Sequence, residues 1–226
     1  MSFRFATPLF GAIAALASCS EGPIGPPQTD ADLRLLHATP NLGAVDVLVS
    51  GTMVIQGVTF GNSSAVVQVP GGMQHVVVRS GSLVLGEFDY TLKTSQTNSL
   101  VVADGSARFS TVVTPDTGAV NPARANVRMV NVTGSNTSDP TLLDVLVKAP
   151  NANPDSVLRF GMDSKVSRYG TLMYFDAGHF DFKYVPSGQN NVLAQVAFDV
   201  AIGQTKAVVL ERAASGTYSA TVVVER

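Results

Sequence analysis

Residues 33–49 of the chain read LRLLHATPNLGAVDVLV. This stretch begins with an apolar run interrupted by Arg34 and His37, and it ends with valine at every second position of 45–49. Short apolar runs and period-two alternation are both typical of β-strands. The Thr-Pro-Asn-Leu-Gly segment between them supplies turn residues. The stretch therefore predicts two strands joined by a turn.

A second copy of this pattern follows about ninety residues later in the chain. VRMVNVT at 127–133 matches the first strand, and LDVLV at 143–147 matches the second after a longer turn. Four further blocks recur in the same order: 60–61 with 160–161, 72–76 with 178–182, 88–89 with 198–199, and 96–102 with 204–210. Ordered matches of this kind predict two tandem copies of one domain.

The composition also favours an all-β protein. Charged residues make up only 14% of the chain, valine, threonine, serine and glycine are abundant, and no segment after Cys19 has a helical apolar face. We therefore predict two antiparallel β-sandwiches with Greek-key connections. The first domain would span 33–113, a Pro- and Gly-containing linker 114–125, and the second domain 126–226.

The first nineteen residues have the order of a secretory signal. One positive charge, Arg4, precedes an apolar run from Leu9 to Ala17 that is too short for a bilayer, which needs roughly 20 residues. Residues 16–19, Leu-Ala-Ser-Cys, resemble the bacterial lipobox. The resemblance implies that 1–18 is a signal peptide and that Cys19 carries the lipids, at the head of a Pro- and Gly-rich tether over 19–32.

Lipidation of Cys19 would make the membrane a partner of the chain, because two or three acyl chains give stable anchoring. An aspartate after the lipidated cysteine often retains a lipoprotein in the inner membrane, and this chain has Ser20 there. We therefore expect anchoring in the outer membrane of the cell envelope. Whether the domains face the periplasm or the outside stays open.

Residues 33–49, the Phe60-Gly61 pair and the turn at 69–72 resemble the domain of unknown function 4397 family. The resemblance covers most of 33–113 and, more loosely, 126–226, where Asn131 replaces the family-like His37. It implies secreted or surface-anchored bacterial proteins, tandem domains, and an Ig-like or transthyretin-like sandwich. The family has no established activity to carry over.

Several function classes are disfavoured. A formal charge of −2 and a pI near 5.9 provide no basic footprint for nucleic acid, and a single cysteine permits no internal disulfide. Serine-nucleophile, P-loop and dinucleotide motifs are absent from the sequence. Asp89 and Asp199 give one carboxylate per copy, short of the pair that hydrolysis of sugars needs. We therefore expect no enzyme, no catalytic residues and no cofactor.

Polar residues leave weaker hypotheses. The histidines are His37, His75 and His179, and we expect strand or turn roles for them and no metal site; His75 and His179 are offset by two positions, so they need not share an environment. Arg34 with Asp46, and Arg128 with Asp144, would form cross-strand pairs that set register, with a recognition site as the alternative. Calcium in the loops 136–139 and 151–155 stays open.

The remaining candidate is aromatic. Tyr169, Tyr174, Phe175 and Phe180 fall within twelve positions of the second copy, where core packing is favoured over a ligand face. Exposed rings would indicate ligand binding and buried rings a scaffold. We therefore expect a lipid-anchored structural or interaction module, with an envelope protein or glycan as possible partner. The alternative is a glycan-binding or surface-attachment module that uses these four rings.

Overall fold

The structure is a computed structural model of the chain. It describes residues 29–94, 97–103, 106–111, 120–133, 142–151, 157–163, 168–212 and 215–225, without the side chains of 106–111, 162–163 and 168–171. Cys19 and the candidate calcium loop at 136–139 lie outside these residues, as do most of the tether and most of the loop at 151–155. Among the described residues, no helix is long and apolar enough to cross a membrane.

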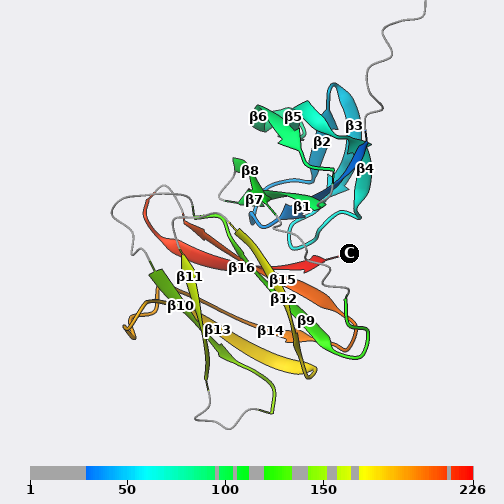
Figure 1. The fold of residues 1–226 in the computed structure, drawn as a ribbon. Helices are drawn as coiled ribbons and strands as arrows, with labels where there is room; N and C mark the ends of the chain where they lie inside the picture. The colour runs from blue at the N-terminus through cyan, green and yellow to red at the C-terminus, as the bar shows by residue number, and fades with distance from the viewer. Residues whose placement is uncertain are drawn as a thin grey trace, which may run out of the picture.

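The first sandwich consists of two four-stranded sheets (Figure 1). Its inner sheet, which faces the second sandwich, has the order β4-β1-β7-β8, and its outer sheet has the order β3-β2-β5-β6. The strands are β1 (Asp30–His37), β2 (Val45–Val49), β3 (Thr52–Val58), β4 (Val67–Pro70), β5 (Gly72–Ser80), β6 (Leu83–Leu92), β7 (Thr97–Ala103) and β8 (Ser106–Thr111).

The second sandwich repeats this topology. Its inner sheet is β12-β9-β15-β16 and its outer sheet β11-β10-β13-β14, so every strand number is that of the first sandwich plus eight. The prediction of an all-β fold with two sandwiches is confirmed. The strands are β9 (Ala125–Asn131), β10 (Leu142–Lys148), β11 (Leu158–Asp163), β12 (Arg168–Phe175), β13 (Gly178–Pro186), β14 (Ala194–Val200), β15 (Thr205–Arg212) and β16 (Tyr218–Glu225).

Strand register agrees with the matched sequence blocks. Arg34 on β1 lies opposite Ser99 on β7, and Arg128 on β9 lies opposite Ala207 on β15. These two pairings are parallel, whereas the other pairings between named strands are antiparallel. The expectation of purely antiparallel sheets is therefore wrong in this detail. A parallel neighbour is possible because the chain passes through the other strands before it returns as β7 or β15, so no tight hairpin joins the pair.

Each sandwich has its own core between its two sheets. On β2 the three valines are buried in that core, and Asp46 and Leu48 are only partly buried on the opposite face of the strand. The second core also contains a group of aromatic rings: Phe180, Phe182, Tyr184 and Phe198.

A third apolar cluster joins the sandwiches through their inner sheets. Its members are Leu36, Ala38, Val101 and Ala103 from the first sandwich and Val130, Val132, Ala207, Val209 and Val223 from the second. One face of each inner sheet packs in the core of its own sandwich, and the other face carries these residues and packs in the joint. The strands of the inner sheets are therefore covered on both sides. Coverage of both faces explains why β1, β7, β9 and β15 are buried along most of their length, on both faces, and are rich in apolar residues.

The observed strands adjust the predicted boundaries slightly. β1 begins at Asp30, so 30–32 form part of a strand where the tether prediction extended to residue 32. β8 ends at Thr111, before the linker expected at 114–125, and β9 begins at Ala125, the last residue of that linker.

Candidate functional site

The four predicted aromatic residues do not form one exposed face. Phe180 is fully buried, with its ring centroid 5.3 Å from that of Phe175 and 5.8 Å from that of Phe198. Tyr174 is 42% exposed, whereas Tyr169 is placed only as a backbone position opposite Val130 on β9. Phe180 points inward because alternate residues of β13 face the core. A ligand face that includes Phe180 would require the core to open, so that part of the hypothesis is wrong.

His37 has a structural environment at the end of β1. Its side chain is fully buried, and its Nε2 lies 3.2 Å from the carbonyl oxygen of Gly43 in the following turn. Burial lowers the pKa of this imidazole. Asn131, its counterpart in the second copy, accepts hydrogen bonds from the backbone N–H and the hydroxyl of Thr133 at 3.1 and 2.9 Å. Both side chains therefore hold the turn that follows their strand.

His75 and His179 share an environment on the outer sheets although they are offset by two positions. His75 Nδ1 lies 2.9 Å from Asp89 Oδ1, and its Nε2 lies 3.3 Å from Glu87 Oε1. His179 Nδ1 lies 3.0 Å from Asp199 Oδ1, directly across the β13–β14 pair. The hydrogen bond to Asp89 raises the pKa of His75. Among the described side chains, no group of three His, Cys, Asp or Glu residues could hold a metal ion.

The predicted pairs Arg34–Asp46 and Arg128–Asp144 are both wrong, because β1 and β2 lie in different sheets, as do β9 and β10. Asp46 accepts a hydrogen bond from the backbone N–H of Gly57 at 2.9 Å.

Asp144, the counterpart of Asp46, fixes a loop of the second sandwich. It accepts hydrogen bonds from the Gly188 backbone N–H at 3.0 Å and from the Ser187 hydroxyl at 3.2 Å, and it also pairs with Arg159. The Gly188 N–H is the main reason that the pKa of Asp144 is lowered. Of the recurrent aspartates on the outer sheets, Asp144 therefore positions a loop, whereas Asp46 binds the backbone of the neighbouring strand β3.

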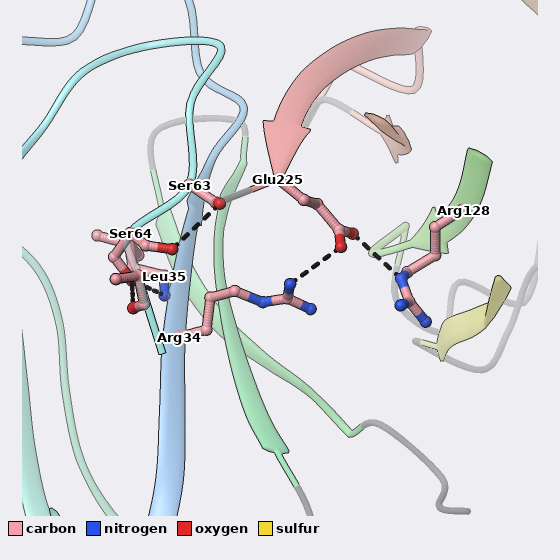
Figure 2. Close-up of polar contacts among 7 residues, drawn as sticks. Arg34, Leu35, Ser63, Ser64, Arg128 and Glu225 are labelled. Carbon is pink, nitrogen blue, oxygen red and sulfur yellow. Dashed lines mark hydrogen bonds and ion pairs between the residues drawn. The ribbon is translucent and has the colours of Figure 1, made fainter. Parts of the chain in front are cut away.

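The recurrent arginines instead converge on one carboxylate at the joint between the sandwiches. Arg34 Nη1 lies 2.9 Å from Glu225 Oε2, and Arg128 Nε lies 3.1 Å from Glu225 Oε1 (Figure 2). The three side chains are between 4% and 9% exposed. Each arginine comes from a different sandwich, so Glu225 at the end of β16 ties the two inner sheets together. We call these three residues the Glu225 clamp.

Backbone hydrogen bonds extend this connection. The N–H of Val224 donates to the carbonyl of Gly61 at 2.8 Å, and the N–H of Ser63 donates to the carbonyl of Val224 at 2.9 Å. The β3–β4 loop that receives β16 is held in turn by the Ser64 hydroxyl, which accepts from the Leu35 N–H at 3.0 Å (Figure 2). The end of β16 thus pairs with β15 of the second sandwich along one edge and with the β3–β4 loop of the first sandwich along the other.

Neither Glu225 nor the joint is predicted from the sequence. The only local signal of Glu225 is a carboxylate that directly follows the apolar run Val222–Val224. Its partners Arg34 and Arg128 are 191 and 97 positions away, so spacing gives no indication of the contact.

The outer sheet of the second sandwich carries two adjoining hollows in its exposed face. One has a volume of about 320 Å³ and is lined by Leu146, Lys148, Val157, Asp181 and Lys183. The other, of about 350 Å³, shares Asp181 and Lys183 with the first and is otherwise lined by β13 and β14. These hollows combine ammonium, carboxylate and amide groups on an open surface, an arrangement suited to binding a polar ligand.

Three solved structures show a distant likeness to this chain. A family 41 carbohydrate-binding module from streptococcal virulence factors, in a study of alpha-glucan recognition, is 13% identical, with 80% of this chain and 93% of that chain covered and a TM-score of 0.27. A Parabacteroides distasonis protein is 11% identical, with coverage of 89% and 99% and a TM-score of 0.27. The Bacillus anthracis TIE protein is 12% identical, with coverage of 85% and 34% and a TM-score of 0.24. TM-scores this low establish neither a common fold nor a common ligand.

Sequence comparison is more specific for the first half of the chain. No curated protein matches the chain. The matched segment of a family model runs through the first sandwich and includes β9 of the second. Residues 31–138 match DUF4397, a domain of unknown function.

Proposed function

We propose that the chain is a lipid-anchored cell-envelope protein whose two sandwiches act together as a structural or interaction module without catalytic activity. The observation that carries this proposal is the joint between the inner sheets, with its apolar cluster and the buried Glu225 clamp. A joint with a packed apolar centre resists independent motion of the domains, unlike the small polar contacts that allow hinge movement. The two outer sheets are then presented at a fixed relative orientation.

Lipid on Cys19 and the tether that follows it would place this rigid pair at a membrane surface. A semi-extended, proline-containing tether spans about 3 Å per residue, so the sandwiches would stand tens of ångströms from the bilayer. Ser20 after the cysteine favours the outer membrane. In this arrangement the outer sheets are available to an envelope protein or a glycan, and the inner sheets serve only as the joint.

A glycan-binding or surface-attachment module is the second candidate. The hollows on the outer sheet of the second sandwich favour it, because they join charged and amide groups in one open surface. The contact face would then be this sheet and not the ring cluster around Phe180.

Intact mass and detergent partitioning of protein purified from bacterial membranes test the anchor, and protease shaving of whole cells tests display. We expect a lipidated Cys19 that partitions into detergent, and a Cys19→Ala chain that stays in the aqueous phase with its sandwiches folded. Shaving-sensitive sandwiches would indicate the outer surface, and protected ones the periplasm. A wild-type chain of unlipidated mass that partitions like Cys19→Ala would overturn the proposal.

A further inference from the structure

We propose that the outer sheet of the second sandwich binds an acidic polysaccharide, with Lys148 and Lys183 as the residues that hold its carboxylates. This inference rests on the proposed interaction role and assigns that role a site and a ligand class. It is carried by the register of the sheet, by the two hollows and by the charges that line them.

Strand register brings the two lysines together. Leu146 on β10 lies opposite Lys183 on β13, and Lys148 lies opposite Asp181, so the two lysines are diagonal neighbours on the outer face. Diagonal neighbours on paired strands lie about 7–8 Å apart at Cα, within reach of one carboxylate for two long side chains. On the other side of β13, Lys183 lies opposite Gln195 on β14, so Leu146, Lys183 and Gln195 are neighbours across the sheet.

The charges of this face are not balanced within it. Among the described residues, neither Lys148 nor Lys183 forms an ion pair with a carboxylate, and Asp181 is instead 3.8 Å from His179 Nε2. The arginines of the outer sheets differ, because Arg159 pairs with Asp144 and Arg79 lies 3.7 Å from Asp46. The two ammonium groups therefore remain available for an anionic group of a ligand.

The shape and chemistry of the face favour a sugar acid polymer over other anions. Each hollow is near the lower end of the size range of ligand pockets, about 300–1,000 Å³, which suits one small ring in each. Asp181, Gln195 and His179 offer acceptors and donors for hydroxyl groups beside the lysines. The lining residues include no exposed aromatic ring, which disfavours stacking of a neutral sugar and the aromatic anchors of protein interfaces.

The first sandwich provides an internal comparison. Leu48 on β2 lies opposite Val77 on β5, as Leu146 lies opposite Lys183, so Val77 occupies the place of Lys183. Ser50, whose N–H donates to the His75 carbonyl, occupies the place of Lys148. The lysine pair is therefore specific to the second sandwich, and the site cannot be a consequence of the fold alone.

Binding of the full chain to polygalacturonate, with its fully methyl-esterified form as the neutral counterpart, tests the inference. We expect binding of the acidic polymer only, with affinity about tenfold lower for each of Lys148→Gln and Lys183→Gln. Lys93→Gln is the matched control, since it removes an exposed lysine of the first sandwich and should leave affinity unchanged. Lys183→Arg should retain most of the binding because it keeps the charge. Unchanged thermal melting of all variants would show that they remain folded.

Three outcomes would overturn the inference: no binding by the wild-type chain, equal loss of affinity in Lys93→Gln, or polyglutamate binding as tightly as polygalacturonate through the same lysines. The last would assign the face to an acidic protein. In each case lipidation and display of the chain would still be open to confirmation, so failure of this site is distinguishable from failure of the proposed function.

Discussion

The covered inner sheets and the open outer sheets of this protein are built from different sequence patterns. β1 and its counterparts at the joint are buried at nearly every position and mostly apolar, whereas β2 alternates buried valines with residues that are only partly buried. A strand with both faces covered needs apolar residues on both, and a strand with one open face needs them only at every second position. Strands with apolar residues on both faces therefore line the joint between the sandwiches as well as their cores.

The strongest test of this comparison is an aspartate placed on each kind of face. Val101 on β7 is fully buried in the joint, and Val77 on β5 lies on the outer face of its sheet. Val101→Asp should cost at least about 4 kcal/mol of unfolding free energy, because it buries an unpaired charge. Val77→Asp should cost roughly 1 kcal/mol or less. Urea denaturation of both variants measures the difference, and equal losses would mean that the joint is not formed.

A second test removes the carboxylate of the clamp. Glu225→Ala leaves Arg34 and Arg128 buried without their shared partner, so we expect a loss of about 3–5 kcal/mol. Glu87→Ala on the open outer sheet is the matched control and should change stability by less than about 1 kcal/mol. If the two variants unfold at the same urea concentration, the clamp contributes no more than a surface ion pair.

The sequence predicts those features of the architecture that depend on neighbouring residues, and it does not predict contacts between residues that are far apart in the chain. The valines at 45, 47 and 49 and their counterparts around Asp144 predict the strands correctly, because alternation along one strand is a local property. The repeat blocks correctly predict that Arg34 and Arg128 are equivalent. Their partner could not be predicted, because strand order and sheet packing decide which distant residues meet.

The aromatic residues illustrate the same limit. Phe180, Phe182 and Tyr184 alternate along the sequence, which predicts one common face. Grouping Phe180 with Tyr174 by proximity in the chain mixed residues of β12 and β13, strands that belong to different sheets. Alternation within a strand was therefore the better guide than density of rings along the chain.

A smaller and sharper test uses the two kinds of histidine. Burial lowers the pKa of His37, and the hydrogen bond to Asp89 raises that of His75. The unfolded value for both is 6.5. Titration of the imidazole NMR signals should therefore place His75 above 6.5 and His37 below it. In a His75→Gln chain the signal with the raised pKa should disappear and the signal with the lowered pKa should remain, which would confirm the assignment. A single pKa near 6.5 for both His37 and His75 would contradict it.

These shifts also give opposite signs for stability against pH. The contribution of His75 is present below pH 6.5 and is lost as the pH rises through its raised pKa. The neutral form of His37 is favoured in the fold, so its contribution is present above pH 6.5 and is lost as the pH falls toward its lowered pKa. The variant His37→Asn introduces the residue found at Asn131. Its melting temperature should fall less than that of the wild-type chain as the pH decreases below 6.5, and an unchanged pH profile would count against this origin.

The measurement that tests the joint most directly is differential scanning calorimetry of the full chain carrying Cys19→Ala, with and without Glu225→Ala. Because the inner sheets share an apolar cluster and the clamp, the chain with Glu225 should unfold in one cooperative transition. Removal of the carboxylate should separate this into two transitions, one for each core. Two resolved transitions in the chain that retains Glu225 would contradict the account, because the sandwiches would then unfold independently.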